Sequence, residues 1–243
     1  MNSKNQLLST VQLDQSLIAK AVERGIVLDC IPFIKVEIIK DKEIATEVER
    51  LCSLPVIAAF TSVHAVYALS KSLYIHKPDW DIYCVGNATR NALLEYFHAS
   101  AIKGCANDAA ALAEVILMDD ISEVFFFCGD KRLDTLPELL TRRQVLVHEV
   151  TVYQTMETPH AIGREYDGIL FFSPSGVHSF FSVNKLNSHA VLFAIGHTTA
   201  AAISEHTGNA VVISETPSKE HLVLQALQYF YQQTSAHNLN KTE

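Results

Sequence analysis

The sequence of 243 residues has no long hydrophobic run and no excess of positive charge. Its apolar runs are far shorter than the roughly 20 residues that cross a bilayer. With 19 Lys and Arg against 27 Asp and Glu, the formal net charge is −8, whereas nucleic acids and anionic membranes are bound by clustered basic residues. We therefore expect no nucleic-acid partner and no membrane partner. The polar N-terminus lacks the apolar segment of a signal peptide, which favours a cytoplasmic location.

Common catalytic and metal-binding motifs are also missing. The five cysteines form no C-x-x-C pair, which indicates reduced thiols rather than a zinc or redox site. The 11 histidines include no H-E-x-x-H and no closely spaced cluster, so we expect no bound metal. G-x-x-x-x-G-K-[ST], G-x-G-x-x-G and G-x-S-x-G are absent as well. Their absence disfavours nucleotide hydrolysis, dinucleotide chemistry and α/β-hydrolase catalysis.

Short apolar runs alternate with amphipathic segments along the chain, which predicts parallel sheets covered by helices. The expected strands are Gln6–Thr10, Ile26–Ile31, Val56–Thr61, Asp81–Val85, Glu123–Cys128, Gln144–Val150, Gly168–Phe172, Val191–Ile195 and Ala210–Ile213. The segments with helical spacing include Leu13–Arg24, Lys42–Cys52, Asn107–Met118 and Ser218–Tyr231. Two further segments, Phe33–Ile39 and Thr151–Thr155, alternate apolar and polar residues and are predicted to prolong strands. We expect them to pair as a two-stranded connection between lobes.

An internal repeat supports two lobes. Three pairs of segments correspond: Ile26–Val36 with Val145–Thr155, Ala59–Val66 with Leu170–Val177, and Cys84–Arg90 with Ala194–Ala200. The duplicated unit is somewhat over a hundred residues long. It predicts two similar α/β lobes with equivalent loops available to face one another.

The repeated loops follow strands and open helices, and ligands of parallel sheets bind at that edge. A helix N-terminus binds anions through free N–H groups without Lys or Arg. The candidate binding residues are Thr61, Ser62, Gly86, Thr89, Ser173, Ser175, Gly176, Val177, Gly196, His197, Thr198 and Thr199. For any single loop, ordinary capping by Ser or Thr and ordinary turning by Gly explain the pattern at least as well. Four matched loops favour a ligand cleft.

Two other features each have a functional and a structural interpretation. Tyr153, in the second alternating segment, either offers a proton to a ligand or packs its ring with the hydroxyl in water. Gly129-Asp130-Lys131-Arg132 either places cations near the ligand or starts a solvated helix.

In their order and spacing, these motifs resemble the uroporphyrinogen-III synthase family from about Gln6 to Tyr231. The matching segments are Phe60-Thr61-Ser62-x-x-Ala65-Val66, Val85-Gly86-x-x-Thr89, Gly129 with Arg132-Leu133, Val152-Tyr153-x-Thr155, Phe172-Ser173-Pro174-Ser175-Gly176-Val177 and Ile195-Gly196-x-Thr198-Thr199-Ala200. Thr10-Val11-Gln12 stands where many members have Thr-Arg-Pro, so no arginine contact is carried over there.

The resemblance implies two flavodoxin-like lobes: residues 1–33 with 158–243, and residues 40–150, joined by residues 34–39 and 151–157. It implies a cyclising lyase of haem biosynthesis that closes hydroxymethylbilane to uroporphyrinogen III with loss of water and inversion of ring D. It also implies no metal or organic cofactor, with Tyr153 as a general acid and the loop residues above as substrate contacts. We expect a monomer. The alternatives are a two-lobed protein that clamps a polyanionic small ligand without chemistry, and a pair of domains that hold phosphate or flavin.

Overall fold

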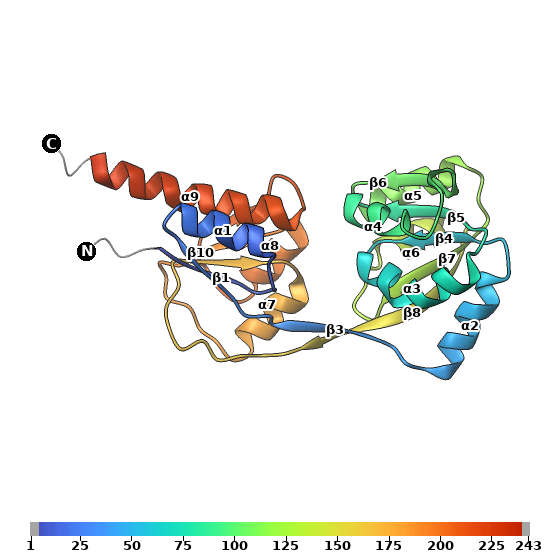
Figure 1. Cartoon of the computed structure of the whole chain (residues 1–243), viewed down its shortest axis with the longest axis horizontal. Coiled ribbons are helices and arrows are strands. Elements are labelled where there is room, and N and C mark those ends of the chain that lie inside the picture. Colours follow the sequence, from blue (N-terminus) through green and yellow to red (C-terminus); the bar gives the residue numbers. More distant parts are fainter. Residues whose placement is uncertain (1–4, 240–243) are drawn as a thin grey trace. The chain divides into compact units, whose positions relative to one another are not determined.

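The computed structural model describes residues 5–239, with side chains up to residue 233; residues 1–4 and 240–243, at the ends of the predicted first lobe, lie outside the described residues. The chain divides into two compact units (Figure 1). Unit 1 contains residues 1–35 and 156–243, so it is discontinuous in sequence, and unit 2 contains residues 36–155. None of the described helices combines the length and the apolar character needed to cross a membrane.

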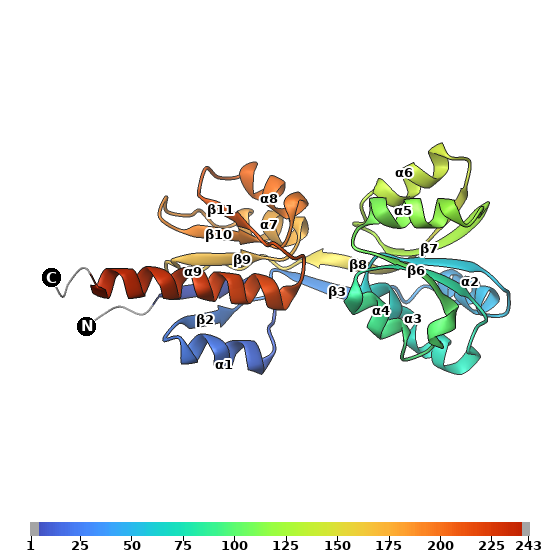
Figure 2. The same ribbon diagram turned by 90° about the horizontal axis from the view of Figure 1, so that it is seen from above.

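Unit 1 has a parallel five-stranded sheet in the order β11-β10-β9-β1-β2. Its elements are β1 (Gln6–Ser9), α1 (Gln15–Glu23), β2 (Val27–Cys30), β9 (Gly168–Phe171), α7 (Pro174–Phe181), β10 (Val191–Ala194), α8 (His197–Ser204), β11 (Val211–Ile213) and α9 (Lys219–Leu239). Helices cover both faces of this sheet (Figure 2). Alternate strand residues explain why: Leu7 packs with residues of α1 and α9, whereas the next residue, Leu8, packs with residues of α7 and α8.

Unit 2 has a six-stranded sheet in the order β3-β8-β7-β4-β5-β6. Its elements are α2 (Lys42–Cys52), β4 (Ile57–Phe60), α3 (Val63–His76), β5 (Asp81–Val85), α4 (Asn87–Leu93), β6 (Ile102–Ala106), α5 (Ala109–Met118), β7 (Glu123–Gly129), α6 (Thr135–Arg142) and β8 (Leu146–Glu157), together with β3 (Ile34–Ile38). One apolar core lies between the sheet and α2, α3 and α4, and a second lies between the sheet and α5 and α6.

The strands β3 and β8 are neighbours in the sheet, and each runs across the boundary between the units. The predicted two-stranded connection is therefore present. The second connecting segment continues a strand as expected, because β8 runs without interruption from Leu146 to Glu157. The first does not: β2 ends at Cys30, and β3 starts only at Ile34. Pro32 stands in this gap, and proline has no N–H to donate to a strand ladder.

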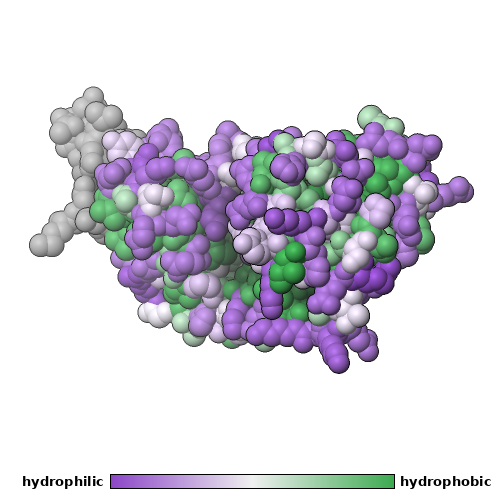
Figure 3. Space-filling view, turned by 45° about the vertical axis from the view of Figure 1, so that its right-hand side comes forward, coloured by the Kyte–Doolittle hydropathy of each residue, from purple (hydrophilic) through white to green (hydrophobic). Residues whose placement is uncertain are grey.

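Strands that correspond in the internal repeat occupy the same relative positions in the two sheets. The series β11-β10-β9-β1-β2 of unit 1 corresponds to β6-β5-β4-β7-β8 of unit 2. Each unit thus takes part of its sheet from the first copy of the repeat and part from the second. The exposed surface in Figure 3 is mostly hydrophilic with interspersed hydrophobic residues, as on most globular proteins.

Candidate functional site

Three loops of unit 2 leave the sheet at the same edge. They follow β7, β4 and β5, which are consecutive in the sheet and pair in parallel. The carboxyl ends of parallel neighbours lie side by side, and this edge is where ligands of such sheets bind. The loops contain Thr61 with Ser62, Gly86, and the segment 130–132.

Ser62 opens helix α3. It adopts an extended conformation at the N-cap, and its Oγ accepts a hydrogen bond from the backbone N–H of His64 at 3.2 Å. This geometry confirms that Ser62 is an ordinary helix cap. It does not exclude ligand binding, since a hydroxyl that accepts one hydrogen bond still has a proton to donate. Thr61 and Ser62 are both partly exposed.

The side chain of Tyr153 lies over the end of β7. Tyr153 pairs with Gly129 across the β7–β8 ladder, and a Cβ on Gly129 would lie 2.4 Å from two carbons of its ring. The ring centroid is 5.7 Å from that of His64, and the hydroxyl is hydrogen-bonded to the Ser62 side chain. Tyr153 is therefore held between the β4 and β7 loops.

Burial raises the pKa of Tyr153 above its ordinary value of about 10. The Ser62 hydrogen bond acts in the opposite direction, and Cys128 and Asp130 raise the pKa further. The phenol keeps its proton at neutral pH, as an unperturbed phenol does. A protonated hydroxyl that is positioned by neighbours on two loops can donate a hydrogen bond or a proton to a bound ligand.

The segment after β7 is tied down by its own contacts. The backbone N–H of Asp130 donates to the Tyr153 carbonyl at 3.1 Å, and its carboxylate accepts from the Thr155 N–H at 2.8 Å. Arg132 forms ion pairs with Asp134 and Glu149. Its charge is thus already compensated, so a ligand carboxylate would have to compete with two protein carboxylates for it.

The loop after β5 turns at Gly86, whose φ of +78° is in the region that favours glycine. Helix α4 starts immediately afterwards and has seven residues. Thr89 has only 4% of its surface exposed. Because Thr89 is turned into the unit, it can offer a large ligand little direct contact.

In unit 1 the corresponding loops follow β9 and β10. Ser173 caps α7, with its Oγ accepting from the Gly176 N–H at 3.1 Å. Beside it Thr10, at the end of β1, donates from Oγ1 to the Leu170 carbonyl at 2.8 Å. Ser175 is partly exposed, whereas Gly176 and Val177 are buried. The Val177 side chain is part of the apolar core, so only its backbone remains for a ligand.

Gly196 is the N-cap of α8 in the β10–α8 loop and has extended backbone angles (φ −173°, ψ 178°). His197 and Thr198 are exposed, whereas Thr199 is 1% exposed. Thr199 occupies the third position after Gly196, as Thr89 does after Gly86. The matched burial of both threonines indicates a packing role at this position, and Thr198 presents the accessible hydroxyl.

The predicted residues thus form one group in each unit. Unit 2 holds Thr61, Ser62, Gly86, Thr89 and Tyr153, and unit 1 holds Ser173, Ser175, Gly176, Val177, Gly196, His197, Thr198 and Thr199. The sequence prediction did not assign roles to Gly129, which Tyr153 covers, or to Thr10, which ties the end of β1 to β9. Only the position of each at the end of a strand signalled them.

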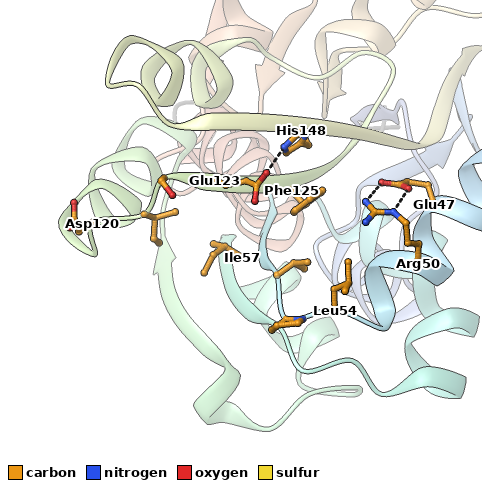
Figure 4. Close-up of a pocket in the computed structure, with 12 residues that line it drawn as sticks. Glu47, Arg50, Leu54, Ile57, Asp120, Glu123, Phe125 and His148 are labelled. Carbon is orange, nitrogen blue, oxygen red and sulfur yellow. Dashed lines mark hydrogen bonds and ion pairs between the residues drawn. The ribbon is translucent and has the colours of Figure 1, made fainter.

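A pocket of about 690 Å³ in unit 2 lies elsewhere (Figure 4). It is lined by Ile57 and Glu123, the first residues of β4 and β7, so it is at the amino end of the sheet. Four of its side chains form two pairs: Arg50 contacts Glu47 at 2.7 Å, and His148 contacts Glu123 at 2.7 Å. We assign no substrate to it, because the capped loops are at the opposite edge.

The fold and the loops define a class of protein. It is an α/β protein of two units, and in each unit a helix capped by serine starts at the carboxyl edge of parallel strands. The chain belongs to the uroporphyrinogen-III synthase family, whose model, described as Uroporphyrinogen-III synthase HemD, matches residues 15–224. A uroporphyrinogen-III synthase of Saccharomyces cerevisiae is 27% identical over 196 residues, which are 69% of this chain and 68% of that protein.

Solved structures share the fold. A mutant uroporphyrinogen III synthase of Thermus thermophilus matches with a TM-score of 0.66 and 19% identity, over 94% of this chain and 99% of that chain. A uroporphyrinogen-III synthetase of Helicobacter pylori matches with a TM-score of 0.66 and 16% identity, over 93% of this chain and 99% of that chain. At these identities the likeness extends to the fold alone.

Proposed function

We propose that this chain closes hydroxymethylbilane to uroporphyrinogen III, with loss of water and inversion of ring D, and is thus a cyclising lyase of haem biosynthesis. The proposal rests on the family match over residues 15–224. It is supported by the matched helix caps at Ser62 and Ser173, each at the carboxyl edge of a parallel sheet.

The charge of the substrate explains the kind of site. Hydroxymethylbilane carries eight carboxylates, and a chain with a formal net charge of −8 cannot attract it by overall charge. Local donors must bind it instead. Backbone N–H groups at helix starts provide them, together with the hydroxyls of Ser62, Ser173, Ser175 and Thr198. We propose that the loops of both units bind carboxylates of the substrate.

The enzyme has mainly to orient the substrate. The bilane closes by itself to the type I isomer, so the enzyme must bring the substituted carbon of ring D to the reactive cation instead of the unsubstituted one. Holding reacting groups in place replaces a large entropic part of the barrier. We propose that many carboxylate contacts share this task, and that no metal or organic cofactor takes part.

Tyr153 is the proposed general acid. Its phenol gives a proton to the departing hydroxyl while the carbon–oxygen bond breaks, which releases water and leaves an azafulvene cation on ring A. Attack by ring D forms a spiro-pyrrolenine, which fragments and closes again with ring D inverted. The last pyrrole carbon then loses a proton, which balances the proton that Tyr153 gave. Burial raises the pKa of Tyr153 and so makes the phenol a weaker acid. The proposed role therefore rests on the position of Tyr153 between the β4 and β7 loops and not on its pKa.

A coupled assay tests the function. Porphobilinogen and hydroxymethylbilane synthase supply the substrate in the presence of the chain, and the products are oxidised and separated as porphyrin isomers. We expect the type III isomer to dominate, both with and without a chelator. Type I porphyrin alone would refute the proposed activity, and a yellow purified protein with flavin absorption would favour the flavin-binding alternative. Light scattering tests the proposed monomer.

A further inference from the structure

Three exposed side chains of unit 1 converge although they have no part in the proposed reaction. Nδ1 of His178, on α7, lies 3.1 Å from Nε2 of His206, just beyond the end of α8. Glu205, which precedes His206, offers a carboxylate oxygen. One ligand atom from each of the three residues lies within 4.8 Å of the other two.

The spacing of the two nitrogens fits a metal ion. Zn²⁺ bonds imidazole nitrogen at about 2.0–2.1 Å in a tetrahedral arrangement, which places two such nitrogens about 3.3 Å apart. The observed 3.1 Å is close to this value. The imidazoles can therefore bind an ion with little movement, and a rotation of the exposed Glu205 side chain brings in the third ligand.

The His206 ring also packs on its neighbours before any ion binds, and it is hydrogen-bonded to the His178 ring. His206 stacks on Phe181 with the ring centroids 4.9 Å apart and the planes 8° from parallel. Phe181 stacks in turn on the fully buried Phe171. The backbone N–H of His206 donates to the Ile203 carbonyl at 3.0 Å. Because His206 is already packed in place, binding loses less conformational entropy at this residue than it would with a free side chain.

We propose that His178, Glu205 and His206 bind a divalent transition-metal ion that links α7 to the end of α8. Two imidazoles and one carboxylate suit Zn²⁺, Cu²⁺ or Ni²⁺, whereas Mg²⁺ and Ca²⁺ prefer oxygen ligands. Water completes the coordination, because all three residues face solvent. The sequence search for metal motifs could not find this site, since the two histidines are 28 positions apart and only the packing of α7 on α8 joins them.

Isothermal titration of the full, untagged chain with Zn²⁺ tests the proposal, with Mg²⁺ as the hard-cation control. We expect one Zn²⁺ per chain and no binding of Mg²⁺. Loss of an outer partner of a ligand typically weakens metal binding by about 10- to 100-fold, so loss of a ligand in His178→Ala or His206→Ala should weaken it at least about tenfold. His189→Ala, which removes another exposed histidine of unit 1, should bind like the parent chain.

Competing ligands are separated by two further measurements. Cys105 is exposed and pairs with Cys84 across the β5–β6 ladder, so the thiols offer an alternative zinc site. In the proposed site, Cys105→Ser leaves Zn²⁺ affinity unchanged, and bound Co²⁺ gives a spectrum without thiolate charge transfer. His178→Gln replaces His178→Ala if the alanine variant does not fold. Affinity that survives loss of both histidines, or that disappears with Cys105, overturns the proposal.

Discussion

Replacing Gly129 by alanine tests whether the position of Tyr153 matters. The new Cβ would lie 2.4 Å from Cε2 and Cζ of the tyrosine ring, and ordinary carbon contacts are about 3.5–4.0 Å. The ring must therefore move by about 1 Å. Overpacking of this kind costs about 1–3 kcal/mol, and 1 kcal/mol lowers Tm by about 2–4 °C in a domain of 150–250 residues. A displacement of about 1 Å at a reacting group can lower the rate about 100-fold.

We therefore expect Gly129→Ala to lower Tm by a few degrees and to lower kcat for type III product by about 100-fold. Gly208→Ala is the matched control, because nothing lies within 4 Å of its added Cβ. Adding Tyr153→Leu to Gly129→Ala should restore part of the stability, since the clash is with the ring itself. If Gly129→Ala keeps full kcat while Tyr153→Phe does not, the ring position is irrelevant and the argument fails.

Four further predictions concern Tyr153, Ser62, Thr198 and the buried thiols. Tyr153→Phe should lower kcat by about 100-fold or more with the fold intact, and equal kcat would remove the phenol from the mechanism. Ser62→Ala should lower the free energy of unfolding by about 1 kcal/mol in urea titrations, because the α3 cap is lost; Ser62→Gly should lower it by less. Thr198→Val should raise KM with kcat unchanged if its hydroxyl binds a carboxylate, and an unchanged KM would contradict this. Burial raises the pKa of Cys52 and of Cys128 to about 11, whereas unfolded thiols ionise near pH 8.5. The unfolded state therefore loses protons first, so the contribution of these thiols to the free energy of unfolding is fully present below about pH 8 and is lost as the pH rises towards about 11. A stability that rises over this range would refute the assignment.

Most of the fold was predictable because hydrophobic periodicity and the repeat agree. Each of the nine expected strands overlaps a strand of the structure. β6 was missed because its short sequence contains Lys103 and Gly104 and lacks an apolar run. Gly104 is nevertheless required by packing, since a Cβ there would lie 2.6 Å from Val115. Helix α6 was anticipated only as the helix start that one interpretation of Gly129-Asp130-Lys131-Arg132 allowed, because it follows a charged segment and has Pro137 in its first turn.

The candidate site was less predictable than the fold. Sequence motifs identify hydroxyls near helix starts, but they do not say which way each side chain turns. Thr198 and Thr199 illustrate this, since adjacent residues of one motif are exposed and buried respectively. The packing of Tyr153 on Gly129 and the meeting of His178 with His206 depend on contacts between distant segments. Local sequence carries no signal for such contacts.

The central claim is that the tetrapyrrole binds at the carboxyl edges of the sheets. Amide hydrogen exchange with and without the product uroporphyrinogen III, kept reduced, tests it most directly. We expect slower exchange at the first turns of α3, α7 and α8, and no change around Ile57 and Glu123 at the amino end of unit 2. Protection confined to that amino end, with the three helix starts unaffected, would contradict the claim.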